Sequence, residues 1–280
     1  MDEGVRQKTV ATPVTLEGKG LHTGEEVSMT LFPSKEDTGI VFRVIQNSRE
    51  IWIPARIEYA TFGSRSTALA NEGVVLRTVE HFLAACWGWG ITNLEVWVEG
   101  GELPGGDSSA LIFFEALARA GMVIQNKLCP VLSLQHVLRV GDTEKGLFAF
   151  PAQDTQVFYL LDVTQKGMFL QSVQFREGDD FACLAQARTF AFEWEIAHIL
   201  EHGLGLGIRS EALVLDPWGR SNHPLRHPQE AAYHKILDFL GDLMLLGVRV
   251  QGGFLGIRSG HQLNQRMVEL LRKEVKNGYH

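Results

Sequence analysis

The chain has 280 residues, of which 45% are hydrophobic, and its formal net charge is −7. This length predicts two domains or one large one, with enough apolar residues for a sizeable core. Because the chain is acidic and has no long basic run, we do not expect nucleic acid as its main partner, although a few local Lys or Arg residues could hold an anionic ligand.

Hydrophobic periodicity divides the chain into strands and helices. Thr78 is placed to cap the first of the helices. Strands are expected within 26–56, at 91–100, within 126–142, at 146–152, at 157–163 and within 248–260. Helices are expected at 79–89, 108–121, 181–190, 192–203, 229–246 and 261–275.

Targeting signals and cysteine motifs are absent from the sequence. The first 20 residues are polar, so we expect no secretory signal. No run approaches the roughly 18 apolar residues of a membrane span, which predicts no transmembrane segment. Cys86, Cys129 and Cys183 are scattered and form no CxxC motif, so neither disulfides nor a cysteine metal site is indicated. The simplest interpretation is a cytoplasmic protein with reduced thiols.

The two halves of the chain resemble one another. Each has a histidine-bearing helix, at 79–89 or 229–246, followed by a strand, a glycine-containing loop and a second helix. This weak repeat predicts an α+β fold of two similar domains, residues 1–127 and 128–280, each a β-sheet packed with a pair of helices. If the helix pairs face each other, the helices are sandwiched at the domain interface, where clefts are common.

The segment YHKILDFLGDL, residues 233–243, is an apolar helix interrupted by ionisable groups. At about 100° per residue, His234, Asp238 and Asp242 fall on one face of the helix, and Lys235 lies beside them. Desolvating such groups is costly unless they are paired or bind a metal. The face is therefore solvated, or it contains a His–Asp pair that holds a core together, or it forms a metal site.

A metal site on this helix needs another ligand, and the first half of the chain can supply it. Zinc in hydrolases typically takes three His, Asp or Glu ligands and keeps a fourth position for water. His81, His234 and Asp238 would provide these three ligands. Glu80 is adjacent to His81, so its carboxylate could take a proton from that water. Fe²⁺ could occupy a site of two histidines and one aspartate as well as Zn²⁺.

A second proton carrier is available at a loop-to-helix junction. His261 titrates near neutral pH and could protonate a leaving amine. Asp242, one turn beyond Asp238, could hydrogen-bond His261, orient it and favour its protonated form. From spacing alone the signal is modest, because Glu-His and His-x₃-Asp are each common by chance.

Four sequence blocks add to this pattern: TVEH, ARTF, HKILDFLGD and SGH, at 78–81, 187–190, 234–242 and 259–261. In this order and spacing they resemble the UDP-3-O-acyl-N-acetylglucosamine deacetylase family, zinc amidases that commit a sugar nucleotide to lipid A synthesis in Gram-negative bacteria. The resemblance covers essentially the whole chain. Further similar segments lie at 16–24, 90–104 and 203–207.

The resemblance implies that family's fold, two α+β domains with the site between the layers. It also implies roles for the ionisable groups. The zinc ligands would be His81, His234 and Asp238. Glu80 would act as the base, and His261, supported by Asp242, would act as the acid.

Substrate contacts follow from the same resemblance. Thr189 would donate to the developing oxyanion, a role its hydroxyl can fill. Lys235 would meet the diphosphate or sugar, and Lys145 would lie near the nucleotide. Phe190 and residues 192–199 would line a passage for the acyl chain. The alternative for the aromatic residues of this stretch is an ordinary core.

The chain departs from the family pattern at two positions. Ser108 stands where the family usually has Gly, so Asp107 is expected to be a helix cap rather than a catalyst. Glu211 stands where many members have Asn, which would alter the wall of the passage. His22 is expected near the site without an assigned role.

These observations predict a zinc-dependent deacetylase that acts on UDP-3-O-acyl-N-acetylglucosamine and releases acetate. Its partner is then a UDP-linked acylated amino sugar with a long acyl chain, and we expect a monomer. One alternative is a metal amidohydrolase for another N-acyl substrate. The other is a non-catalytic sugar-nucleotide binder on the same fold, although a binder needs no acid–base pair.

Overall fold

The computed structural model describes residues 4–46, 48–62, 65–164, 167, 169–206 and 212–277. The predicted departure at Glu211 lies outside the described residues.

Two five-stranded sheets of the same topology dominate the described fold. In each, two antiparallel hairpins flank a central strand that comes later in the sequence, antiparallel to one hairpin and parallel to the other. The first sheet has the spatial order β2 (Val14–Lys19), β3 (Glu26–Pro33), β9 (Leu94–Glu99), β4 (Ile40–Gln46) and β5 (Arg49–Pro54). The second has the order β12 (Leu138–Gly141), β13 (Gly146–Phe150), β19 (Gly253–Ile257), β14 (Gln156–Asp162) and β15 (Leu170–Arg176).

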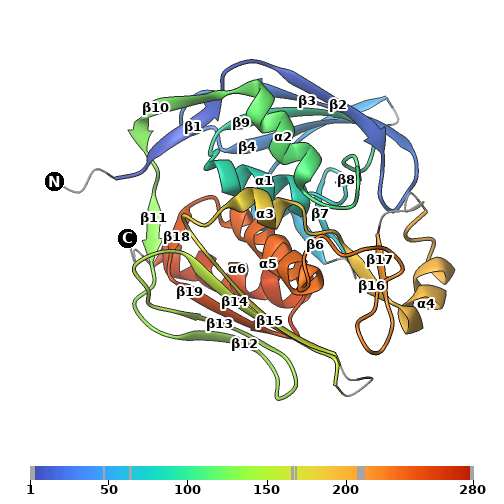
Figure 1. Ribbon diagram of the computed structural model, residues 1–280. Coiled ribbons are helices and arrows are strands. Elements are labelled where there is room, and N and C mark those ends of the chain that lie inside the picture. The colour runs from blue at the N-terminus through green and yellow to red at the C-terminus, as the bar shows by residue number, and fades with distance from the viewer. Residues whose placement is uncertain are drawn as a thin grey trace.

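Four long helices lie between the two sheets (Figure 1). They are α1 (Glu80–Trp89), α2 (Leu111–Ala120), α5 (Glu230–Leu243) and α6 (His261–Lys276). Helix α1 packs against α2 and α5, and α5 packs against α6 and the second sheet. The predicted α+β fold of two similar halves with their helices sandwiched is therefore confirmed.

Alternation along the strands explains why the sheets face the helices. Strand β3 buries every second residue, and Met29 and Leu31 are fully buried. Side chains of successive strand residues point to opposite faces, so one face of the sheet supplies the core. In the second half, Phe254 of β19 packs on Phe239 of α5, with ring centroids 4.9 Å apart. These apolar residues belong to one continuous core.

The contact between α1 and α5 depends on a glycine. A Cβ added to Gly241 would lie 2.0 Å from the carbonyl oxygen of Glu80, a distance that no side chain tolerates. The absence of a side chain lets the start of α1 approach α5 closely. Glu80 and His81 are therefore held against the polar face of α5.

Shorter elements join these layers. Among the described residues, β6 (Ala60–Phe62), β7 (Thr67–Asn71) and β8 (Val74–Leu76) form a three-stranded sheet. The two-stranded pairs are β1 (Arg6–Val10) with β10 (Met122–Leu128), β11 (Val131–Ser133) with β18 (Arg249–Gln251), and β16 (Phe190–Phe192) with β17 (Leu213–Leu215). The remaining helices are α3 (Phe181–Ala185), α4 (Ile196–Glu201), η1 (Ile57–Tyr59), η2 (Glu193–Glu195) and η3 (Met244–Leu246).

Two local expectations were wrong. Thr78 does not cap α1: it has a left-handed backbone, φ 59°, and its hydroxyl donates to the buried carboxylate of Glu102 over 2.7 Å. The helix expected at 181–190 ends at Ala185. Phe190 instead begins strand β16, because residues 190–192 pair in parallel with β17, a partner distant in the sequence.

The chain passes from one half to the other between β10 and β11. Strand β10 pairs with β1 of the first half, whereas β11 pairs with β18 of the second. The division that the sequence predicts, at 127/128, falls one residue before the end of β10, and we propose that the first half extends to Leu128. No helix within the described ranges combines the length and the apolar character needed to cross a bilayer.

A buried ion pair fixes the start of α5. Glu230 Oε1 accepts hydrogen bonds from the backbone N–H of Arg188 over 3.1 Å and from its Nε over 2.8 Å, and Oε2 accepts one from the backbone N–H of Arg226 over 2.7 Å. Burial raises the pKa of Glu230, but the hydrogen bonds outweigh burial and hold it below its usual value.

We expect Glu230→Gln to lower the free energy of unfolding by about 3–5 kcal/mol at neutral pH, because it removes the charge opposite buried Arg188. The pKa of Glu230 is lower in the folded protein than in the unfolded chain, where it is about 4.3. The stabilisation from the ionised carboxylate is therefore complete above about pH 4.3, and it is lost as the pH falls through the folded pKa. Urea unfolding at several pH values should show a constant difference above about pH 5 that shrinks below about pH 4. The exposed Glu193→Gln is the control. A difference that persists undiminished in acid would contradict the assignment.

Candidate metal centre

Three predicted ligands meet where α1 approaches α5. His81 comes from the first turn of α1, and His234 and Asp238 lie one turn apart on α5. Each can offer one ligand atom such that all three atoms lie within 4.8 Å of one another. Asp238 Oδ1 is 3.7 Å from His81 Nε2 and 3.2 Å from His234 Nε2. All three side chains are buried.

The protonation of the two histidines suits a cation. His234 Nδ1 lies 2.9 Å from the carbonyl oxygen of Ala187. A carbonyl can only accept, so Nδ1 carries a proton, and Nε2 is the nitrogen that faces Asp238. Burial, together with the neighbouring His234, lowers the pKa of His81 to about 3, so this imidazole is neutral.

Asp238 provides the clearest sign of a missing partner. Its Oδ1 atom is buried and has no hydrogen-bond partner among the described residues. Its Oδ2 atom accepts a hydrogen bond from Lys235 Nζ over 2.7 Å. Although burial opposes it, His234 and Lys235 hold the pKa of Asp238 well below its usual range. A buried anionic oxygen that faces two imidazole nitrogens fits a divalent metal ion.

The predicted proton carriers surround this group. His261 Nε2 is 3.9 Å from Glu80 Oε1 and 3.7 Å from Asp238 Oδ2. His261 Nδ1 donates to Asp242 Oδ2 over 3.0 Å, and Asn264 Nδ2 donates to the same oxygen over 2.9 Å. The structure therefore brings Glu80, His261 and Asp242 together at the ligand group.

Burial and charge shift the two carriers in the same direction. Burial raises the pKa of Glu80 to about 8. Burial opposes protonation of His261, but the carboxylates of Asp242 and Asp238 outweigh it and raise its pKa to about 9. A bound cation adds positive charge beside both groups and would lower both pKa values.

Thr67 of β7 connects these carriers, and no sequence motif singled it out. Its hydroxyl donates to Asp242 Oδ1 over 2.5 Å and lies 3.2 Å from His261 Nδ1. Its backbone N–H donates to Glu80 Oε2 over 3.1 Å. One fully buried residue thus contacts Glu80, His261 and Asp242.

The ARTF segment borders the site beside His234. The ring of Phe190 lies 6.4 Å from the His234 ring, and Lys235 Nζ lies 5.5 Å from the centre of the Phe190 ring. In the chain, Thr189 comes between Ala187 and Phe190, which both contact His234. The backbone N–H of Thr189 donates to the carbonyl oxygen of Ser108 over 2.7 Å.

The remaining predicted positions lie outside the ligand group. Lys145 lies in the exposed turn between β12 and β13, where its backbone N–H donates to Asp142. Asp107 is not the helix cap that the sequence predicted, because α2 begins only at Leu111. Its carboxylate instead accepts from Ser109 and pairs with Arg226 at 2.6 Å.

Two further residues near the site have local explanations. Ser108 has a left-handed backbone, φ 69°. Glycine adopts this conformation without strain, which explains why the family usually has glycine at this position. His22 is buried, and its Nδ1 atom has no hydrogen-bond partner within the described ranges. Its backbone N–H donates to Glu102 over 2.9 Å, so the same carboxylate holds both Thr78 and the loop that carries His22.

Comparison with known proteins identifies this arrangement. Residues 7–273 match the family model described as UDP-3-O-acyl N-acetylglycosamine deacetylase. The chain belongs to this family. A Pseudomonas entomophila protein named UDP-3-O-acyl-N-acetylglucosamine deacetylase is 37% identical and aligns over 97% of this chain and 91% of its own. Proteins of the same name from Aquifex aeolicus and Chlamydia trachomatis serovar L2 are 36% and 32% identical, over 96% and 97% of this chain and 94% and 98% of their own.

Membership of the deacetylase family confirms the resemblance that the sequence blocks carried. It also confirms the expected class of activity, a hydrolytic deacetylase of lipid A biosynthesis. Members of this family are metalloenzymes, in agreement with the group formed by His81, His234 and Asp238.

The contacts of Thr67 generate a prediction for deacetylase turnover. Thr67→Val leaves Asp242 Oδ1 without its donor, so kcat should fall by about tenfold to a hundredfold, the effect of losing one hydrogen bond to a charged group. KM and metal content should stay near wild type, because Thr67 contacts neither the three ligands nor, by this account, the substrate.

Thr67→Ser retains the hydroxyl and should restore most of kcat. Thr61→Val, in the neighbouring strand β6, removes a hydroxyl that donates to the Ala68 carbonyl and serves as the matched control. Full activity in Thr67→Val, or a serine variant as impaired as the valine variant, would contradict this role.

Proposed function

We propose that His81, His234 and Asp238 hold a zinc ion, and that the chain uses it to remove the N-acetyl group of UDP-3-O-acyl-N-acetylglucosamine. The observation that carries the proposal is the buried, unpartnered Oδ1 atom of Asp238, which faces two imidazole nitrogens. Bound zinc would polarise the acetyl carbonyl and lower the pKa of a bound water. Fe²⁺ suits the same donor set.

Glu80 and His261 divide the proton transfers. Glu80 accepts the proton of the attacking water, because its carboxylate lies beside the ligand group without being needed as a ligand. His261 donates a proton to the amine as the C–N bond breaks. Asp242 accepts from His261 Nδ1, which directs Nε2 toward Glu80 and Asp238 and favours the protonated ring.

Polar groups at the edge of the site would bind the reacting amide and the nucleotide. The Thr189 hydroxyl donates to the oxyanion that develops on the acetyl carbonyl. Lys235 supplies positive charge for the diphosphate or sugar while it holds Asp238 Oδ2, which leaves Oδ1 for the metal. Lys145 is proposed to approach the nucleotide from the β12–β13 turn.

Aromatic residues after ARTF are proposed to line the acyl passage. Phe190 lies over Lys235 and beside His234, and Phe192 stacks on Trp194 with ring centroids 4.5 Å apart. Phe190 is half-buried, which leaves part of its ring available to a ligand, whereas Phe192 is buried in the core. The cytoplasmic location and the monomeric state stay predictions.

Metal analysis should separate ligands from proton carriers. His81→Ala, His234→Ala and Asp238→Ala each remove one of three protein ligands, so the purified variants should contain little zinc. Glu80→Ala and His261→Ala should keep zinc and lose turnover by about 10²–10⁴-fold, the usual contribution of general acid–base catalysis. Asp242→Asn should also keep zinc.

The exposed His198 on α4 provides a matched histidine control, and His198→Ala should keep both zinc and turnover. Plasma emission analysis of each variant gives the metal content, and removal of zinc by a chelator should abolish wild-type turnover until zinc is restored. A Glu80→Ala variant without zinc, or a His81→Ala variant with full zinc, would reverse the assignment of this pair.

Substrate assays should distinguish the proposed activity from its alternatives. The purified protein should release acetate from UDP-3-O-acyl-N-acetylglucosamine, and free UDP should compete. An analogue with a much shorter acyl chain should have a lower kcat/KM, and Phe190→Ala should reduce that difference. Turnover that UDP does not inhibit would favour an amidohydrolase for another substrate. Binding without acetate release would favour a non-catalytic sugar-nucleotide binder.

A further inference from the structure

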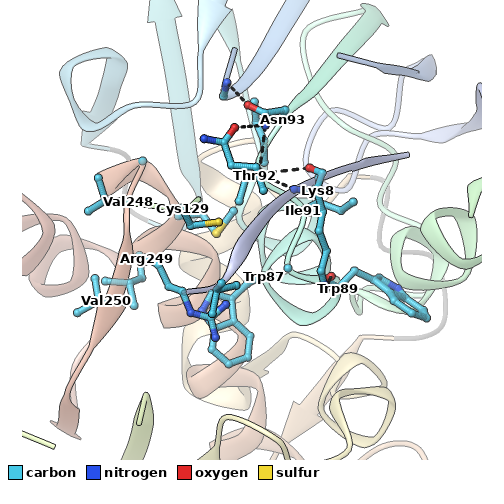
Figure 2. Close-up of a pocket in the computed structure, with 18 of the residues that line it drawn as sticks. Lys8, Trp87, Trp89, Ile91, Thr92, Asn93, Cys129, Val248, Arg249 and Val250 are labelled. Carbon is cyan, nitrogen blue, oxygen red and sulfur yellow. Dashed lines mark hydrogen bonds between the residues drawn. The ribbon is translucent and has the colours of Figure 1, made fainter. Parts of the chain in front are cut away.

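A second hollow lies at the far end of α1 from the ligand group. Its volume is about 510 Å³, within the range of pockets that bind small molecules. Helix α1 begins with Glu80 at the ligand group and contributes Trp87 and Trp89 to this pocket (Figure 2). At 1.5 Å per residue, roughly 10 Å separate the two sites along the helix. Within the described chain, the pocket lining includes none of the residues assigned to deacetylation.

Both halves of the protein form the walls of this pocket. Figure 2 shows Cys129 and residues 248–250 on one side, with Lys8 and Trp89 on the other. Apolar surface comes from several elements, and the ring of Trp87 packs against that of Phe181 with centroids 5.9 Å apart. Ile91 adds further apolar surface.

The acidic side chains of the pocket already have partners. Asp37 accepts from Gln7 over 2.7 Å and forms an ion pair with Lys127. Glu177 forms an ion pair with Arg249. Asp179 accepts from the backbone N–H of Arg176 over 2.7 Å. The ion pairs compensate the charges of Asp37 and Glu177, whereas Asp179 is held by a backbone N–H that carries no full charge.

Two cations of the pocket have only carbonyl partners. Lys8 Nζ donates to Trp89 at the end of α1 over 3.2 Å, and Arg56 Nη1 donates to Leu246 at the end of η3 over 3.4 Å. In the part of the chain that the structure describes, neither forms an ion pair with a carboxylate. A helix end carries only about half a unit of negative charge, so each cation keeps a net positive charge and unused donors. Burial and the nearby Arg272 lower the pKa of Arg56, although Glu58, which pairs with Arg272, opposes them.

We propose that this pocket binds a small organic anion with a flat apolar body. The anionic group would meet Lys8 and Arg56, and the body would lie against Trp87 and Ile91. An anion suits the site better than a cation, because Lys8 and Arg56 form no ion pair among the described residues, whereas two of the three acids do. The two positive charges therefore exceed the single negative charge of Asp179. This proposal does not depend on the deacetylase mechanism, since the two sites share no residue.

A matched pair of probes tests the proposal. 1-Naphthoate and 1-naphthamide have the same ring system and differ in charge. Isothermal titration of the zinc-loaded protein should show one site that binds the acid roughly fivefold more tightly than the amide, the upper end of what a partly exposed ion pair contributes. Arg56→Gln and Lys8→Gln should each weaken naphthoate binding and leave naphthamide binding unchanged.

Two further variants control for location and net charge. Val248→Trp places a large side chain in the pocket and should remove binding of both probes, while acetate release at the other site verifies that the variant is folded. Arg139→Gln, on the exposed side of β12, makes the same charge change far from the pocket and should bind both probes as wild type does.

Three results would overturn the proposal: no saturable binding of naphthoate, equal affinity for acid and amide, or naphthoate affinity that Arg56→Gln and Lys8→Gln leave unchanged. A crystal structure with naphthoate would also decide it. The probe should occupy the space between Lys8, Arg56 and Trp87. Density beside Phe190 in the acyl passage instead would show that the probe binds the substrate site.

Discussion

The site depends on one buried carboxylate, Asp238. An anionic oxygen without a hydrogen bond in the protein interior is costly unless a charged partner neutralises it. Lys235 satisfies Oδ2 over 2.7 Å, whereas Oδ1 faces His81 and His234 and has no hydrogen bond among the described residues. A neutral imidazole that turns its Nε2 lone pair toward Oδ1 cannot donate a hydrogen bond to it. A metal ion would resolve this arrangement, because it could accept electron pairs from all three groups.

The repeated architecture places these groups together. Each half supplies one of the two helices that carry the predicted ligands, α1 and α5, and these helices pack against each other between the sheets. Gly241 allows the backbone of Glu80 to approach α5 closely, so Glu80 and His81 from the first half reach His234 and Asp238 of the second. His261 is also buried; Asp242 accepts from it, and Asn264 and Thr67 hold Asp242 through hydrogen bonds. The contact between α1 and α5 thus joins the two halves and also sets the geometry of the site.

The sequence predicted what local periodicity and motif spacing encode. The long helices that carry His81, His234 and His261 follow from apolar patterns, and the repeat predicted the two similar layers. Thr67 could not be predicted, because it belongs to a short strand without a motif and its partners lie 13, 175 and 194 residues away. The strand at Phe190 was missed for the same reason, since its pairing with β17 is not local.

Side-chain competition explains the other failures. Thr78 is a residue type that often caps helices, but its hydroxyl donates a hydrogen bond to the buried carboxylate of Glu102 instead. Asp107 is likewise a common capping residue, but its carboxylate pairs with Arg226 and accepts a hydrogen bond from Ser109. The pocket at the end of α1 joins segments from both halves, so no single stretch of sequence indicates it.

The most direct test is a crystal structure of the zinc-loaded protein with anomalous diffraction data at the zinc edge. The account predicts one strong anomalous peak about 2.0–2.2 Å from His81 Nε2, His234 Nε2 and Asp238 Oδ1, with Glu80 and His261 beyond ligand distance. A peak bound by Glu80 or Asp242 in place of one of these ligands, or zinc held elsewhere in the protein, would contradict it.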